Sequence, residues 1–124
     1  MAFTAGIKSY ADQILDKIDP ENKIFAKRLY RDSCVRCDQF FIKDLDVIMD
    51  RKKESIIIVD NSIMSFAFDL ANGVPIKDYM GDDPNDKHLL YLYSFCEQAF
   101  YYDDVRKALD ECFKLRYILS SITG

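Results

Sequence analysis

Long hydrophobic runs and blocks of basic residues are both missing from this 124-residue sequence. No apolar stretch approaches the roughly 20 residues that a membrane-spanning helix requires. The N-terminal residues Met-Ala-Phe-Thr-Ala-Gly have neither the basic flank nor the apolar core of a secretory signal. Acidic residues outnumber basic ones by 21 to 17, and no cluster of lysine or arginine is long enough to follow a phosphate backbone. We therefore expect no membrane span, no secretory leader and no direct nucleic-acid binding.

Cysteine is too sparse for a disulfide-stabilised scaffold, since the chain has only four. Reduced thiols are the better interpretation. Cys34 and Cys37 have the spacing of a zinc knuckle, but Cys96 and Cys112 are 16 positions apart and His88 is the only histidine. Structural zinc sites usually combine two close pairs of ligands. We favour a hairpin thiol and two core cysteines, with zinc as the alternative.

The composition is that of one ordinary folded domain, with 49% apolar and 31% charged residues. Its most informative stretch is Ser55–Ser62, where three isoleucines and a valine form an apolar run without polar alternation. This pattern favours a strand buried on both faces of a parallel sheet. The run ends at Asp60 and Asn61, and ligands of open α/β sheets bind at the carboxyl ends of strands. An Asx turn at these residues is the alternative.

Short strands and one helix are expected in the first third of the chain. Residues 1–3 resemble the end of a strand that passes through Thr4 into a helix, which Pro20 would follow. The apolar positions of that helix are Tyr10, Ile14, Leu15 and Ile18. The β-favouring runs Arg28–Arg31 and Gln39–Ile42 indicate two short strands near the sheet, with pairing between them left open.

The second half predicts an edge strand at Val74–Ile76 and two helices. The first helix would start at the acidic segment Asp82–Asp86, and the last would start at Asp103 or Asp104. The residues expected to face inward are Leu89, Leu92, Tyr93, Cys96 and Phe100 in the first helix and Val105, Leu109, Cys112 and Phe113 in the last. An aromatic group could be a protein-binding patch, but we favour a core role. Its members are Tyr91, Tyr93, Phe95, Phe100, Tyr101 and Tyr102.

Strands that alternate with helices indicate a layered α/β fold. Within it, short motifs follow one another in a specific order. They are Phe3-Thr4-Ala5, Tyr10-Ala11-Asp12, Arg28 to Cys34, Ile42 to Leu45, Val59 to Ser62, Asn72 to Ile76 and Asp103 to Arg106. This set resembles the RNA polymerase II carboxyl-terminal-domain phosphatases and their small-phosphatase relatives, in the haloacid-dehalogenase superfamily. The similarity runs from about Phe3 to about Leu109, so the resemblance implies a Rossmann-like parallel sheet with flanking helices.

The resemblance implies a Mg²⁺-dependent phosphatase that acts on phosphoserine or phosphothreonine in proteins through an aspartyl-phosphate. Thr4 matches the hydroxyl residue that binds the phosphoryl oxygens, and Lys43 matches the lysine that holds the phosphoryl group. Arg31 matches an arginine that contacts the substrate phosphate. Asn61 would be a Mg²⁺ ligand, and Asp60 would orient metal-bound water. Taken alone, Thr4 would be a capping hydroxyl and Lys43 a surface lysine.

The nucleophile motif of that family, Asp-x-Asp-x-Thr, is missing. It belongs upstream of Thr4, and Asp44-Leu45-Asp46 is a decoy because it lies only 16 positions before Asp60. We therefore interpret residues 1–118 as a partial domain without the first, central strand and most of the second, followed by a tail at 119–124. Unpaired strand edges invite pairing, so we expect inactivity alone, with self-association or a complementing N-terminal segment.

A non-catalytic protein-binding module is the competing hypothesis, because the receptor subunit of the mitochondrial presequence translocase has a similar domain. Retention of the charged site residues favours an active ancestor, since a scaffold has no reason to keep a charged cluster that is costly to bury. Loss of the nucleophile favours the binding module. The phosphatase hypothesis implies a nuclear or cytoplasmic location, and the alternative a mitochondrial one.

Overall fold

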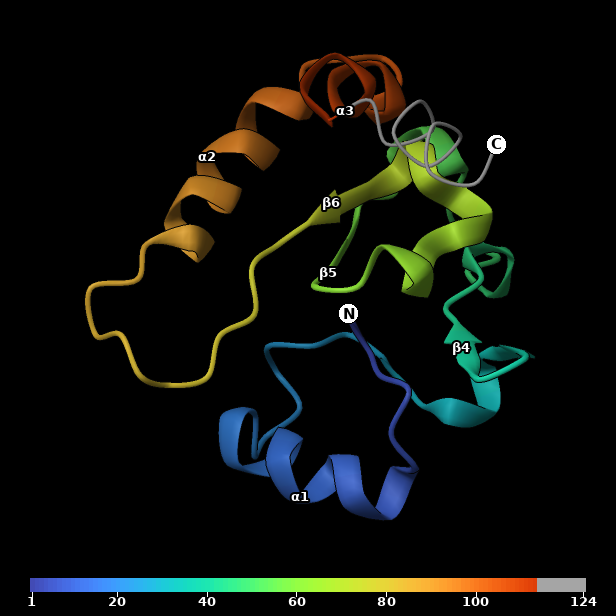
Figure 1. Ribbon diagram of the computed structural model, residues 1–124, viewed down its shortest axis with the longest axis vertical. Coiled ribbons are helices and arrows are strands. Elements are labelled where there is room, and N and C mark those ends of the chain that lie inside the picture. The colour runs from blue at the N-terminus through green and yellow to red at the C-terminus, as the bar shows by residue number, and fades with distance from the viewer. Residues whose placement is uncertain (114–124) are drawn as a thin grey trace. The chain divides into compact units, whose positions relative to one another are not determined.

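The computed structural model describes residues 1–113, which combine short parallel strands with helices in an α/β arrangement (Figure 1). The chain divides into two compact units at Val47, and each is described here by itself. The expected tail at 119–124 lies outside the described residues, and the extent of the domain, residues 1–118, stays a prediction. Within residues 1–113, no helix is both long and apolar enough to cross a membrane.

The first unit begins with a β-α-β arrangement. Strand β1 (Ala2–Phe3) pairs in parallel with β2 (Arg28–Leu29), and helix α1 (Lys8–Ile18) connects them. The register places Phe3 beside Leu29. This confirms the expected strand end, the helix and its termination before Pro20.

The buried carboxylate of Asp19 organises the return from α1 to β2. Its two oxygens accept hydrogen bonds from the backbone N–H groups of Lys23, Ile24 and Phe25, at 2.8 to 3.0 Å. Its backbone carbonyl accepts a bond from Nη2 of Arg28 at 2.9 Å. One side chain therefore fixes the loop that brings the second strand alongside the first.

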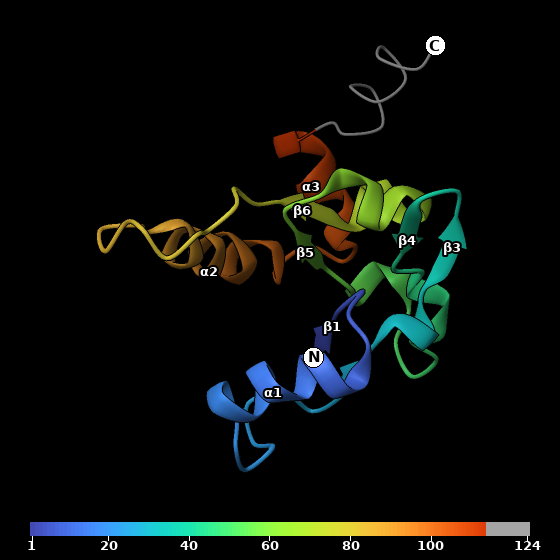
Figure 2. The same cartoon turned by 60° about the horizontal axis from the view of Figure 1, so that its bottom comes forward.

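A β-hairpin follows, formed by β3 (Val35–Cys37) and β4 (Phe40–Ile42), which are antiparallel (Figure 2). Asp38 has a φ of 54° in the two-residue turn, as a tight hairpin requires. The pairing between Arg28–Arg31 and Gln39–Ile42, which the sequence left open, therefore does not occur. Each run pairs with another strand, because the turn at Asp38 brings β4 against β3. The 3-10 helices of this unit are η1 (Arg31–Ser33) and η2 (Leu45–Val47).

The second unit is built on β5 (Ile58–Asp60) and β6 (Gly73–Pro75), which pair in parallel and lie side by side in Figure 1. The 3-10 helix η3 (Lys53–Ser55) precedes β5, and the helical turns of η4 (Ile63–Asn72) connect the two strands. Phe66 from η4 is fully buried and packs against the backbone of Gly73. Helix α3 (Val105–Phe113) contributes the buried Leu109 to the same core.

The expectation of a strand buried on both faces is wrong for β5. Ile58 and Asp60 are buried, but Val59 between them is 36% exposed. Successive strand residues point to opposite faces, and only one face is covered here. The strand also starts later than the apolar run, since Ile56 and Ile57 lie between η3 and β5.

Helices α2 (His88–Ala99) and α3 (Val105–Phe113) complete the described chain. Helix α2 begins later than expected, because Asp83 and Asp86 bind the backbone N–H groups of Asn85 and His88 in turns before it. Helix α3 begins after Asp104, as predicted, and the Asp104 carboxylate accepts a bond from the Arg106 backbone N–H.

The predicted inward face of α2 is largely wrong. Leu89, Tyr93 and Phe100 are 71%, 65% and 82% exposed, whereas Leu92 and Cys96 are half-buried. The aromatic group is likewise mostly exposed, so its expected core role is wrong. In α3, Val105 and Leu109 are buried as expected, but Cys112 is exposed. Apolar residues follow one another along α2, so the helix has a broad apolar surface. The rest of the described second unit packs against only part of that surface.

Candidate functional site

Thr4 lies directly after β1, where the chain turns toward α1. Its backbone N–H donates to the carbonyl of Leu29 at 2.9 Å, which continues the pairing with β2. Its hydroxyl oxygen accepts a hydrogen bond from the backbone N–H of Gly6 at 3.0 Å. The hydroxyl thus shapes the turn, and its own hydrogen is still left to donate to a ligand.

Arg31 lies at the carboxyl end of the neighbouring strand and reaches the same turn. Its backbone N–H donates to Gly6 O at 3.0 Å, and its Nε donates to Ala5 O at 2.7 Å. The guanidinium also stacks on the Phe41 ring, 4.6 Å from the ring centroid. The structure therefore brings Thr4 and Arg31 to one edge of the β1–β2 pair.

Lys43 belongs to the same unit and follows β4 directly. It is half-buried between the buried residues Ile42 and Leu45. Cys34 ends the motif that runs from Arg28 to Cys34, and its Sγ lies 3.9 Å from Thr4 O and 3.8 Å from Tyr30 O. These contacts fit the interpretation of Cys34 as a structural thiol.

A polar network beside this edge was not predicted from the sequence. Asp12 of α1 accepts hydrogen bonds from Lys8, Tyr30 and Arg28. The bonds from Lys8 and Tyr30 lower the pKa of Asp12 from 3.8 to about 2. The motif Tyr10-Ala11-Asp12 pointed to this position, but nothing in it indicated that Asp12 connects α1 to β2.

Asp60 and Asn61 lie at the carboxyl end of β5 in the second unit. Asp60 is 8% exposed, and its Oδ1 accepts a hydrogen bond from the Ser62 backbone N–H at 2.9 Å, so the Asx turn is also present. The Asn61 Nδ2 donates to Oδ1 of Asp78 at 2.8 Å. Sequence reasoning missed Asp78, because nothing in the local sequence indicates that it faces Asn61.

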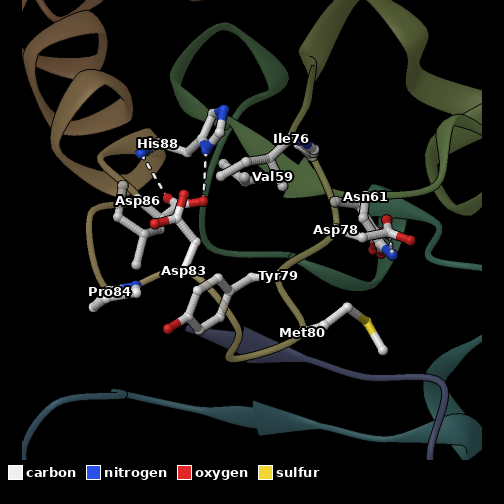
Figure 3. Close-up of a pocket in the computed structure, with 13 residues that line it drawn as sticks. Val59, Asn61, Ile76, Asp78, Tyr79, Met80, Asp83, Pro84, Asp86 and His88 are labelled. Carbon is white, nitrogen blue, oxygen red and sulfur yellow. Dashed lines mark hydrogen bonds and ion pairs between the residues drawn. The ribbon is translucent and has the colours of Figure 1, made fainter.

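A cavity of about 630 Å³ opens at this shared carboxyl edge. Asp60, Asn61 and Asp78 line one part of it. In the view of Figure 3, Asn61 and Asp78 lie together on one side, and Asp86 and His88 lie on the other. The segment after β6 and the start of α2 supply the remaining wall.

The oxygen donors of this edge fit Mg²⁺. The Asn61 nitrogen faces Asp78, which leaves the amide oxygen for a cation, and two carboxylates lie in the same cavity wall. Mg²⁺ binds through oxygen and keeps several waters, so few protein ligands are needed. Among residues 1–113, no group of three or more His, Cys, Asp or Glu side chains is arranged to hold a metal. The zinc alternative at Cys34 and Cys37 gains no support.

The predicted site residues are thus distributed over both units. Thr4, Arg31 and Lys43 belong to residues 1–47, whereas Asp60 and Asn61 belong to the second unit. Within each unit, polar side chains gather at the carboxyl ends of parallel strands, where α/β folds bind their ligands.

A family profile described as NLI interacting factor-like phosphatase matches residues 1–106. The chain belongs to this phosphatase family. Three relatives illustrate the similarity. CTD small phosphatase-like protein 2 of Dictyostelium discoideum is 45% identical over 95% of this chain, and nuclear envelope morphology protein 1 of Schizosaccharomyces pombe is 41% identical over 86%. The human CTD small phosphatase-like protein is 39% identical over 86%.

The aligned region is only part of each relative. It covers 20% of the Dictyostelium protein, 22% of the fission yeast protein and 38% of the human protein. The resemblance to the CTD phosphatases is confirmed by these matches. The α/β class expected from the sequence agrees with the mixed helices and small parallel sheets of the structure.

Proposed function

We propose that this chain forms part of a Mg²⁺-dependent protein phosphatase that acts on phosphoserine and phosphothreonine. Membership of the phosphatase family supports a phosphatase-type domain. The observation that carries the finer proposal is the Asn61–Asp78 hydrogen bond in the cavity at the carboxyl end of β5. This bond leaves the Asn61 amide oxygen available for a cation at the edge of the sheet where an α/β phosphatase would hold its metal.

Asn61 would hold the metal through its amide oxygen, with Asp60 and Asp78 nearby. Bound Mg²⁺ supplies charge neutralisation for the phosphoryl group that is transferred. The buried Asp60 fixes the end of β5 through its bonds to the backbone N–H of Ser62 and, from its carbonyl, of Ile76. This rigidity keeps Asn61 in position.

The first unit would bind the phosphate. The Thr4 hydroxyl donates a hydrogen bond to a phosphoryl oxygen, and the Arg31 guanidinium provides a charge-assisted contact. Lys43 serves as a compact positive charge for the phosphoryl group and the nucleophile. The shared edge of Thr4 and Arg31 supports this assignment, because both residues approach the turn at Gly6.

The nucleophile would come from outside these 124 residues, which contain no Asp-x-Asp-x-Thr. In the proposed reaction, an aspartate oxygen bonds to phosphorus while the ester oxygen leaves with a proton. Water then hydrolyses the aspartyl-phosphate and releases inorganic phosphate. The chain alone is therefore catalytically silent.

The architecture in this proposal is a haloacid-dehalogenase-type Rossmann-like sheet whose first strand and most of whose second are absent from the chain. Strand β1 has two residues, and Val59 of β5 is exposed. Exposed apolar residues on α1, among them Tyr10, Ile14 and Ile18, support the same idea. Self-association or an N-terminal segment would cover these surfaces.

Complementation tests the proposal. The chain is assayed for phosphate release from a phosphoserine peptide with Mg²⁺, alone and with a fragment that carries the strand and Asp-x-Asp-x-Thr of a family member. We expect turnover only in the mixture, and none when the first aspartate of the fragment is changed to asparagine. Turnover by the chain alone would contradict the assignment.

A non-catalytic binding module is the second candidate, and the missing nucleophile favours it. This module would bind its peptide without hydrolysis and would not respond to the fragment. If the chain is part of a phosphatase, we expect a nuclear or cytoplasmic location. If it is a binding module, we expect a mitochondrial location. Peptide binding that depends on the phosphate, together with turnover in the mixture with the fragment, would support the phosphatase. Peptide binding without turnover in that mixture would support the binding module.

A further inference from the structure

The cavity at the β5–β6 edge extends well beyond the proposed metal residues. The rest of its wall is formed by the segment after β6, which includes Tyr79, Met80, Asp83 and Asp86 (Figure 3), and by Leu89 in the first turn of α2. Its volume, about 630 Å³, is within the range of sites that enclose small ligands. The proposed phosphatase chemistry at Asn61 leaves this wall without a role.

We propose that this wall binds the side chain of a lysine or arginine that lies close to the phosphorylated residue of a peptide substrate. The inference rests on the proposed function, because it takes Mg²⁺ to be held by Asn61 in the same cavity and the substrate phosphate to be bound to that metal. It adds the substrate class: phosphopeptides with a basic residue beside the phosphoserine or phosphothreonine.

The apolar part of the wall suits the hydrocarbon stem of a basic residue. Val59 and Ile76 line the cavity together with the more exposed side chains of Tyr79, Met80 and Leu89. Lysine and arginine place their methylene groups on apolar surface and keep the charged end in contact with water or a partner. The face of Tyr79 offers such a cation a further favourable contact.

The charge of the wall selects a cation. Asp60, Asp78, Asp83 and Asp86 line the cavity, whereas Lys77 is the lysine among its lining residues. A phosphate brings its own negative charge, which offsets that of a bound Mg²⁺. The carboxylates that face the rest of the peptide therefore attract a basic side chain and repel an acidic one.

Asp83 and Asp86 are fixed in place by local bonds. Oδ1 of Asp83 accepts the backbone N–H of Asn85 at 2.9 Å, and Oδ1 of Asp86 accepts that of His88 at 2.9 Å. The His88 Nδ1 lies 2.8 Å from the other oxygen of Asp86. The bonds from His88 lower the pKa of Asp86, so this carboxylate remains charged at neutral pH.

The test measures binding of fluorescent phosphoserine peptides to the 124-residue chain with Mg²⁺. The peptides are identical except for one neighbouring residue, which is arginine, lysine, glutamine or glutamate. An extended peptide advances about 3.3 to 3.6 Å per residue, so each of the first three positions on either side is tried. We expect the arginine and lysine peptides to bind about tenfold more tightly than the glutamine peptide at the best position, and the glutamate peptide to bind more weakly.

The variants Asp83→Asn and Asp86→Asn, separately and together, assign this preference to the wall. Asparagine keeps the oxygen that accepts the backbone N–H, so the turns are retained while the charge is removed. The double variant should reduce the preference to about twofold or less. The control is Asp82→Asn, which removes the same charge one residue away from the cavity lining and should leave the preference unchanged.

The outcomes separate this inference from the proposed function. Equal binding of all four peptides, no binding by any of them, or an equal loss of preference in the Asp82→Asn control would overturn the inference. The unphosphorylated arginine peptide tests the proposed function. If it binds as well as the phosphorylated form, phosphate recognition fails, even where the preference for a basic residue remains.

Discussion

The side-chain nitrogen of Asn61 donates a hydrogen bond to Oδ1 of Asp78 at 2.8 Å, which joins the end of β5 to the segment after β6. This bond orients the amide oxygen that we assign to Mg²⁺. Changing Asp78 to alanine should reduce Mg²⁺-dependent phosphopeptide binding about tenfold, because residues that orient a ligand typically matter to that degree. A peptide titration at several Mg²⁺ concentrations measures the effect.

Asp82→Ala is the matched control, since Asp82 does not line the cavity. A similar loss in both variants would mean that only the general negative charge of the segment matters. The role of Asp78 would then be wrong.

Gly73 should not tolerate a side chain. A Cβ at this position would lie 2.0 Å from Cε2 of the fully buried Phe66, so the ring would have to move. Overpacking of this kind costs about 1 to 3 kcal/mol or more. We expect Gly73→Ala to lower the urea midpoint clearly, with part of the loss recovered in the Gly73→Ala, Phe66→Leu double variant.

Gly81 provides the comparison, because it has a φ of 76° but no heavy atom within 4 Å of a built Cβ. Gly81→Ala should cost only about 1 kcal/mol through backbone strain. If Gly81→Ala destabilised the chain as much as Gly73→Ala, the packing explanation would fail.

Asn72 joins the end of η4 to the segment that precedes β5 in the second unit. Its buried amide nitrogen donates to the carbonyls of Lys53 and Ile56, at 2.7 and 2.9 Å. Asn72→Ala leaves both carbonyls without this donor and should reduce the free energy of unfolding by about 1 to 3 kcal/mol. Asn72→Asp should also destabilise, because a carboxylate cannot donate. The exposed Asn85→Ala variant serves as control, and equal urea midpoints for the Asn72→Ala and Asn85→Ala chains would contradict the prediction.

Some elements of the fold could be predicted from the sequence, and others could not. The helix over Lys8–Ile18 and the presence of strands at β5 and β6 follow from local patterns, because apolar spacing and turn residues mark them directly. The partners of β2 and β4 do not, since runs of two or three residues carry no information on which strand they join. Only the left-handed turn at Asp38 decides the pairing of β4.

The site shows a similar division. Thr4 and Asp60 were predicted as site residues because they belong to an ordered set of motifs, and their roles stay a prediction. Asp78 could not be predicted, since nothing in the local sequence says that it faces Asn61. The exposure of Leu89 and Tyr93 was also missed, because periodicity indicates which face of a helix is apolar but not whether anything covers it.

Acid should selectively weaken the connection between α1 and β2. Asp12 has a pKa lowered to about 2 by the bonds from Lys8 and Tyr30, against 3.8 ordinarily. A lowered pKa in the folded state means that, as the pH falls, the Asp12 carboxylate is protonated in the unfolded chain before it is protonated in the folded chain. The contribution of Asp12 is therefore complete well above pH 3.8 and is lost as the pH falls through about 2.

The stability difference between the chain and its Asp12→Asn variant should be largest near neutral pH and shrink toward pH 2. Denaturant titrations across this range measure it, and Asp32→Asn, an exposed aspartate of the same unit, is the control. A difference that stays constant with pH would show that the charge of Asp12 is not what stabilises the contact.

Phosphate release by the complemented chain tests the central claim most directly. The chain, its Lys43→Met variant and its Asn61→Ala variant are each mixed with the fragment that carries Asp-x-Asp-x-Thr, and release from a phosphoserine peptide is followed with Mg²⁺. The account predicts turnover with the unchanged chain and a loss of at least about a hundredfold with either variant. Equal rates with all three chains would contradict it.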